Sequence, residues 1–153
     1  MLELDRDKPG ARMLWPDAEP AMKRILSNTS TALFRGDYVY SARTSGELVC
    51  LEAATGRQVW ETNSITEPKN GSSIHITASD EAVWLFTDRG ELIRAQLSPP
   101  GYREFGRAAL LKPTSNFGSR KVAWSPPAYA NRHVFARSDA KLVCASLAAA
   151  PAR

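Results

Sequence analysis

A strand-turn-strand pattern that returns at nearly constant spacing is the strongest constraint on the fold of this chain. Its first copy is Tyr38–Leu48, in which apolar and polar residues alternate on either side of a turn at Ser45-Gly46. The pattern returns at Ala82–Leu92, with the turn glycine 44 residues later, and at His133–Leu142, whose leucine lies 50 residues after Leu92. A repeat of about 40 to 50 residues built from short strands is typical of propeller blades. We therefore predict an all-β repeat protein.

Period-two alternation, bounded by Gly, Asn, Asp or Ser, predicts the individual strands. The first full unit is expected to contain Thr29–Phe34, Tyr38–Arg43, Glu47–Ala53 and Arg57–Thr62. The second unit is expected to contain Ser72–Ala78, Ala82–Thr87, Glu91–Leu97 and Tyr102–Leu111, and the third Val122–Ser125, His133–Arg137 and Lys141–Leu147. Leu2–Asp5 and Gly10–Trp15 echo the last two strands of a unit, and a short helical turn is expected within Glu19–Leu26.

These units predict one partial propeller over residues 1–153, with antiparallel four-stranded blades. It comprises the end of a preceding blade (1–18), two full blades (27–63 and 70–112) and a blade without its outer strand (120–148). About three blades cannot close a ring, since closed propellers have about four to eight. Each blade is buried by its neighbours, so an open arc exposes apolar blade faces and strand edges.

Three interpretations of this incomplete arc remain open. The chain is a fragment of a longer protein, which we favour, or a second copy completes it, or it persists as an open arc. In the second case, strand Lys141–Leu147 would pair with Arg12–Trp15 of the other copy.

The segment Leu51-Glu52-Ala53-Ala54-Thr55-Gly56-Arg57-Gln58-Val59-Trp60 resembles the repeat of the quinoprotein-like (pyrroloquinoline-quinone-type) β-propellers. That repeat reads Ala-Leu-Asp-Ala-x-Thr-Gly-x-x-x-Trp, and Gly46–Leu51 resembles the residues that precede it. The resemblance implies that Trp60, and by analogy Trp15, dock against the neighbouring blade, with Gly56 in the turn before Trp60. Packing is the expected role of Trp60, because an indole buries about 150–250 Å² and its N–H can reach a carbonyl. The 44-residue offset places Glu104 where the second unit should carry this tryptophan.

The same family contains alcohol and sugar dehydrogenases that carry the quinone, as well as cofactor-free proteins such as the propeller subunit of the bacterial outer-membrane assembly machine. Fold membership does not choose between them. The sequence lacks the adjacent cysteines associated with the cofactor-binding dehydrogenases, and Asp37, Asp80, Asp88 and Asp139 stand at expected turns, where Asp bonds the local backbone. We expect no catalytic, cofactor or metal residues, and a scaffold or protein-interaction role. Part of a quinone-dependent alcohol or sugar dehydrogenase is the alternative.

His75 is the most interesting titratable residue, because it lies on the first strand of its unit, the strand that lines a propeller's central channel. Lys69 and Asn70 precede it and are further channel-side candidates. A lone imidazole could act as a base or ligand, but a hydrogen-bonded structural histidine is the preferred interpretation.

The charge distribution limits the classes of partner that we expect. The net charge is +4, but the 20 basic residues are scattered among 16 acidic ones, which argues against nucleic-acid binding.

No run reaches the roughly 18 apolar residues of a membrane span, and Met1–Pro9 is charged where a secretion signal is apolar. As given, the chain would stay in the cytoplasm, whereas a longer parent protein could be exported. The expected partner is a protein or a second copy, bound through blade faces and edge strands.

The two cysteines fall at equivalent places in different units. Cys50 and Cys144 are therefore expected to lie too far apart for a disulfide, and both are expected to be buried thiols on inner strands.

Overall fold

The computed structural model describes residues 1–15, 26, 29–69 and 71–148. Strands form the regular structure of this part of the chain, as predicted. In chain order they are β1 (Leu2–Leu4), β2 (Ala11–Met13), β3 (Leu33–Arg35), β4 (Tyr38–Ala42), β5 (Leu48–Glu52), β6 (Gln58–Thr62), β7 (Ile74–Ser79), β8 (Ala82–Thr87), β9 (Glu91–Ser98), β10 (Gly101–Ala109), β11 (Ser115–Phe117), β12 (Arg120–Val122), β13 (Ala128–Ala130), β14 (His133–Arg137) and β15 (Leu142–Ser146).

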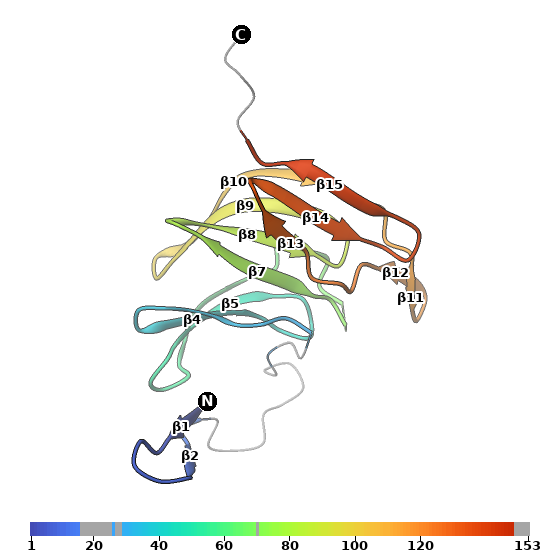
Figure 1. Cartoon of the computed structure of the whole chain (residues 1–153). Helices are drawn as coiled ribbons and strands as arrows, with labels where there is room; N and C mark the ends of the chain where they lie inside the picture. Colours follow the sequence, from blue (N-terminus) through green and yellow to red (C-terminus); the bar gives the residue numbers. More distant parts are fainter. Residues whose placement is uncertain (16–25, 27–28, 70, 149–153) are drawn as a thin grey trace.

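The strands form antiparallel sheets that follow one another in chain order. The N-terminal hairpin is β1-β2, the first sheet is β3-β4-β5-β6, the second is β7-β8-β9-β10 and the third is β13-β14-β15. A separate hairpin, β11-β12, lies in the connection between the second and third sheets. Figure 1 shows the sheets stacked from the blue N-terminal hairpin to the red third sheet, without closing into a ring. The fold is an all-β, incomplete β-propeller.

The repeated turn glycines allow close approach between a hairpin and the connection that follows. Gly46 has φ +100° and Gly90 has φ +75°, a region that side chains with a Cβ adopt reluctantly. A Cβ on Gly46 would lie 2.9 Å from the Cβ of Ser72, and one on Gly90 would lie 2.3 Å from the carbonyl oxygen of Leu111. The spacing of these glycines therefore reflects both turn geometry and packing.

The first sheet is covered on both faces, which explains why its central strands are almost continuously apolar. Val39 and Val49 pack toward the N-terminal hairpin, together with Trp15. Tyr40 and Leu48 pack on the other face, against residues of the second sheet. We call this second interface the first seam; its buried members are Tyr40, Ala42, Leu48, Cys50, Ile65, Ile74, Val83, Leu85, Ile93, Ala95 and Leu97.

The second seam lies between the second and third sheets. Its buried members are Phe86, Leu92, Leu111, Ala123, Val134 and Ala136. The opposite face of the third sheet is open: along β15 the side chains alternate between half-buried and exposed. Leu142 on that face is 74% exposed and Phe135 is 37% exposed.

Most of the predicted strands are present, with boundaries that differ by a few residues. The largest shortening is at the start of the first sheet, where β3 begins at Leu33 and not at Thr29. Upstream of Leu33, Leu26 forms an isolated β-bridge with Arg43 and packs against the cluster of Val39 and Val49. The helical turn predicted within Glu19–Leu26 lies, apart from Leu26, outside the described residues.

The prediction of a strand at Val122–Ser125 as the first strand of the third sheet is wrong. Val122 instead ends β12, which pairs with β11, and the inner strand of the third sheet is β13. Two prolines at 126 and 127 separate the segments, and proline cannot donate to a strand ladder. The other two predicted strands of this sheet are confirmed as β14 and β15.

The cysteine prediction holds for one residue only. Both thiols are free, and Cys50 is buried in the first seam, but Cys144 is exposed. Cys144 lies on the open face of β15, where no further sheet of the described chain covers it. In the described residues, no helix has the length and apolar character that a membrane crossing requires.

Candidate functional site: the seams between the sheets

Trp60 joins the first sheet to the second. It extends from β6, half-buried, and its indole Nε1 donates to the carbonyl oxygen of Ser98, 2.9 Å away, at the end of β9. Its ring lies 5.9 Å from the ring of Tyr40. The side chain thus combines apolar contact in the first seam with a hydrogen bond that fixes its orientation.

Trp15 makes the corresponding contact one sheet earlier. Its Nε1 donates to the carbonyl oxygen of Ala53 over 2.8 Å, and this bond spans 38 residues of sequence, as does the bond from Trp60 to Ser98. Gly56 makes room for the ring: a Cβ at this position would lie 2.6 Å from Cδ2 of Trp15. Gly56 also has φ +71°, so the turn and the aromatic contact both favour glycine.

The second sheet carries Gly106 at the position where the first sheet carries Trp60. Trp60 lies opposite Cys50, and the residue before it, Val59, is an unpaired bulge residue. Gly106 lies opposite Arg94, again directly after a bulge. The sequence offset placed Glu104 at this position, which is wrong, because the β9-β10 hairpin is two residues longer than the β5-β6 hairpin.

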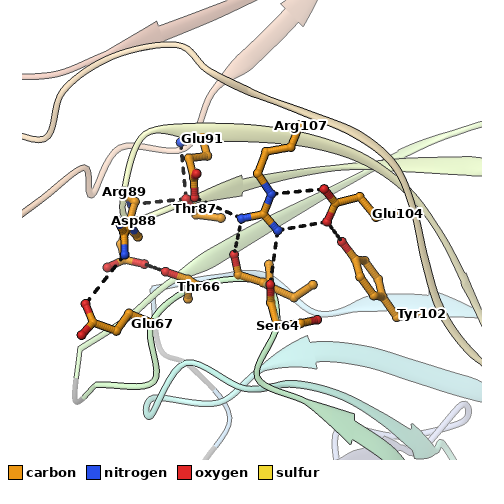
Figure 2. Close-up of polar contacts among 11 residues, drawn as sticks. Ser64, Thr66, Glu67, Thr87, Asp88, Arg89, Glu91, Tyr102, Glu104 and Arg107 are labelled. Atoms are coloured by element: carbon orange, nitrogen blue, oxygen red, sulfur yellow. Dashed lines mark hydrogen bonds and ion pairs between the residues drawn. The ribbon is translucent and has the colours of Figure 1, made fainter.

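Arg107 holds the outer strand of the second sheet in place of a tryptophan. Its guanidinium donates to the carbonyl oxygens of Ile65 (3.1 Å) and Ser64 (3.2 Å), which belong to the connection that leaves the first sheet. It also contacts the carboxylates of Glu104 and Glu91 at 3.0 and 3.3 Å. Figure 2 shows the guanidinium between Glu104 and the chain at Ser64.

The charges in this cluster reinforce one another. The hydrogen bonds of Arg107, and then that of Tyr102, lower the pKa of Glu104. Burial, and then the Glu104 carboxylate, raise the pKa of Tyr102, whose hydroxyl donates to Glu104 over 2.6 Å. Around neutral pH, Glu104 is therefore ionised and Tyr102 is neutral. Arg107 keeps its counter-charge, and the Tyr102 hydroxyl keeps its proton to donate.

A buried ion pair stands at the inner end of the second seam. Asp88 is fully buried; it accepts a hydrogen bond from the Thr66 hydroxyl at 2.8 Å and forms an ion pair with Arg120 of β12. The backbone N–H of Ala123 also donates to the Asp88 carbonyl, 2.7 Å away. Asp88 follows a strand, as expected. The prediction that its carboxylate bonds the local backbone is wrong, because the carboxylate bonds Thr66 and Arg120, which are distant in sequence.

The predicted channel-side residues do not form one site. His75 on β7 is 6% exposed, and its Nε2 lies 3.1 Å from the carbonyl oxygen of Trp124, to which the neutral ring donates. Burial lowers the pKa of His75, with the carbonyl acting in the opposite direction. Lys69 is exposed and pairs with Glu67 at 2.6 Å, and Asn70 lies outside the described residues. Across the described chain, no three His, Cys, Asp or Glu side chains are grouped so that they could hold a metal ion.

A small groove opens into the second seam. We call it the Trp84 groove; its lining residues are Thr77, Ala78, Ser79, Trp84, Tyr129, Ala130, Asn131, Arg132, His133 and Leu147. Its volume is about 270 Å³, and it lies beside the hairpin turns of β7-β8 and β13-β14. The hydroxyl of Tyr129 is buried in this groove beside the hydroxyl of Thr77. Burial raises the pKa of Tyr129 to about 12, partly opposed by the neighbouring Thr77 hydroxyl.

Sequence reasoning missed Arg107 and Arg120, and it gave Asp88 a local turn role in place of its contacts with Thr66 and Arg120. Each bonds to residues between 22 and 43 positions away along the chain. No local pattern marks such a contact. The one available signal was the absence of a docking tryptophan from the outer strand of the second unit, which required another means of holding that strand.

Comparison with known proteins identifies one family. The family described as "Outer membrane protein assembly factor BamB" matches residues 7–95. A comparison with curated proteins yields no match. Among solved structures, BamB from Moraxella catarrhalis aligns with a TM-score of 0.52 and 19% identity, covering 78% of this chain and 31% of that one.

A second solved structure is a europium-containing methanol dehydrogenase. It aligns with a TM-score of 0.51 and 10% identity, covering 88% of this chain and 30% of its own. At these identities the two structures support the fold alone, and the chain spans about a third of the length of each. The family match covers more than half of the sequence and includes Gly56, Trp60 and the turn at Gly46. This chain belongs to the BamB-like family of proteins with quinoprotein-type β-propeller repeats.

Proposed function

We propose that this chain is a non-catalytic propeller segment that works as a scaffold or protein-interaction module. The observation that carries the proposal is the open apolar face of the third sheet. Leu142, Phe135 and Cys144 lie on this face, whereas Val134 and Ala136, which alternate with them, are buried in the second seam.

The open face is of the kind that another protein surface covers. Sheets in a stacked repeat obtain their stability from neighbour interfaces, and an exposed end sheet without a polar outer face tends to associate. The edge of β15 is also unpaired in the described sheet, so it presents backbone donors and acceptors. The N-terminal hairpin offers a second apolar end, with Leu4 72% exposed.

The polar residues that a catalytic site would recruit are engaged in structural contacts. His75 bonds a backbone carbonyl, Asp88 bonds Arg120 and Thr66, and Glu104 bonds Arg107. Similarity to the assembly factor supports the same interpretation.

Sedimentation velocity at increasing micromolar concentrations tests the proposal. We expect concentration-dependent association of the wild-type chain, and a marked reduction in Leu142→Glu, which puts a charge on the open face. Lys112→Gln lowers the net charge by the same one unit at an exposed position elsewhere and should associate like the wild type. A wild-type chain that remains monomeric throughout would contradict the role of this face.

The second candidate function is part of a quinone-dependent alcohol or sugar dehydrogenase. Its basis is that the quinoprotein-type repeat also occurs in such dehydrogenases, and that a methanol dehydrogenase shares the fold. The purified chain can be mixed with pyrroloquinoline quinone and Ca²⁺ and then separated from free quinone. Retained quinone absorbance, or alcohol oxidation coupled to a dye, would replace our proposal with this one.

A further inference from the structure

We propose that the open face of the third sheet packs against the N-terminal hairpin β1-β2 of a second copy of this chain. The inference rests on the proposed interaction function and names the partner and the surface that the partner uses. It starts from the opposite end of the stack in Figure 1, where the hairpin also presents an exposed apolar face. Two copies would make this contact twice, each giving its hairpin to the other.

The exposed face of the N-terminal hairpin is defined by its strand register. Leu2 lies opposite Met13, and Leu4 lies opposite Ala11, so the four side chains share one face. Leu2, Leu4 and Met13 are 55%, 72% and 61% exposed. Met1, whose side chain alternates with that of Leu2, packs toward the first sheet. The hairpin therefore directs its apolar face away from that sheet.

The open face of the third sheet is apolar across all three strands. One row of this face consists of Ala128 on β13, Phe135 on β14 and Cys144 on β15. Leu142 lies on the same face, opposite Arg137 in the strand register. The face is thus a flat apolar surface, of the kind that the other sheets bury against their neighbours.

Large apolar side chains that remain exposed gather on these two faces. The described residues include seven of them, of which three belong to the hairpin face and two to the third sheet. The remaining two are Phe34 and Phe105. Since burial of apolar area drives most protein association, contact between the two faces would remove most of this exposed apolar surface from water.

Charge favours the hairpin over a second third sheet as the cover. Arg137 shares the open face, so packing two third sheets against each other would bring both copies of this guanidinium into one apolar contact. Like charges in such a contact repel each other. The hairpin turn instead contains the exposed carboxylates of Asp5 and Asp7, beside Arg6 and Lys8. Arg137 can pair with a carboxylate there.

The region of the hairpin already covers a sheet within its own chain. Trp15, which follows β2, packs with Val39 and Val49 of the first sheet and donates to the carbonyl oxygen of Ala53. In the proposed contact, the hairpin would lie between two sheets, as the first sheet does. The hairpin and three sheets of each copy would give eight layers in a dimer, within the range of about four to eight blades in closed propellers. A two-fold dimer satisfies both ends of each copy.

Sedimentation velocity tests the hairpin separately from the open face. We expect the wild-type chain to form a dimer and Leu4→Glu to weaken it at least tenfold, because the charge lies on the hairpin face. Phe105→Glu places the same charge at an exposed apolar position on β10, outside both faces, and should associate like the wild type. An equimolar mixture of Leu4→Glu and Leu142→Glu should associate more tightly than either variant alone, since a mixed dimer retains one unaltered contact.

Disulfide trapping locates the contact even if a charged variant does not fold. Cys144 is exposed on the open face, whereas Cys50 is buried. In Leu4→Cys treated with diamide, we expect a covalent dimer that joins position 4 of one copy to Cys144 of the other. The two thiols lose two electrons and two protons, which diamide accepts. The double variant Leu4→Cys with Cys144→Ser, and the single variant Phe105→Cys, should remain unlinked.

The outcomes distinguish the hairpin contact from the function on which it rests. Association that is lost in Leu142→Glu but unchanged in Leu4→Glu would overturn the hairpin as the partner surface and leave the open face as an interaction surface. A disulfide between the Cys144 residues of two oxidised wild-type chains would show face-to-face packing and would also overturn the inference. A wild-type chain that stays monomeric at every concentration would contradict both.

Discussion

The first seam and the second seam join sheets of the same design by different means. In the first, Trp60 covers the interface and bonds the next sheet. In the second, Gly106 leaves the corresponding space open, and the buried pair of Asp88 and Arg120 fixes the inner end. The comparison shows that a repeat can lose its aromatic contact at one interface and retain the stacking through polar contacts.

The apolar seam and the ionic seam should respond differently to substitutions. Apolar contacts depend on area and shape, so an aromatic seam tolerates small shifts. A buried ion pair requires both partners, because a single buried charge is strongly unfavourable. The second seam should therefore respond more sharply to single substitutions, although it buries fewer large side chains.

Removing the cation of the second seam should have the largest effect. Arg120→Ala leaves Asp88 buried and without its counter-charge, and we expect a loss of about 3–5 kcal/mol in the free energy of unfolding. Urea denaturation measures this change. The double variant Asp88→Ala with Arg120→Ala should recover part of the loss, and a double variant less stable than Arg120→Ala would contradict the role of the pair.

Removing the aromatic contact of the first seam should come next. For Trp60→Ala we expect a loss of about 3 kcal/mol, the lower end of the range for such truncations, because Trp60 is half-buried. Trp60→Phe retains the ring contact and loses the bond to Ser98, so it should cost about 1 kcal/mol. Equal losses in the two variants would show that the hydrogen bond, and not the packing, joins these sheets.

The cluster around Arg107 should contribute less, since it is partly exposed. We expect Arg107→Gln to cost about 1 kcal/mol, because it removes the ion pairs to Glu104 and Glu91 and shortens the reach to Ser64 and Ile65. Denaturation at low and at high salt measures the effect. The difference between wild type and variant should shrink at high salt, and an unchanged difference would contradict an ionic contribution.

The smallest expected effect is a dependence of folding stability on pH, caused by His75 in the second seam. The folded-state pKa of His75 is lowered by burial, so the unfolded chain binds more protons as pH falls through about 6.5, the ordinary value for histidine. Stability should therefore decline between pH 7.5 and 5.5, and His75→Gln should decline less. Thermal unfolding of both proteins across this range is the measurement; parallel curves would show that His75 does not contribute.

Much of the fold was predictable because its causes are local. Alternation identified β4, β5, β8, β9, β14 and β15 with small errors at their ends. The prediction failed at Val122–Ser125, where a short alternating segment pairs with β11 instead of the third sheet. Alternation shows that a residue is extended but not which strand lies beside it.

The candidate site was predictable only in part. Trp60, Trp15 and Gly56 were identified from one motif, and their contacts are present in the structure. The equivalence of Gly106 was not identified, because a hairpin two residues longer shifts the count without changing the pattern. The Trp84 groove has no local signal, since its walls come from two sheets.

The amino-acid sequence alone determined that this protein is a row of β-sheet repeats with glycine turns, and the resemblance of one unit to the quinoprotein-like repeat implied a docking role for Trp60. The repeats and the turns were predictable for a physical reason. These properties depend on side-chain alternation and on backbone conformations that few residues adopt, and both can be read within one hairpin. Only the tertiary structure decided that the second seam lacks its aromatic residue, that Asp88 is buried with Arg120, and that Cys144 is exposed. Those outcomes depend on which sheet covers which face, and that requires contacts between distant parts of the chain.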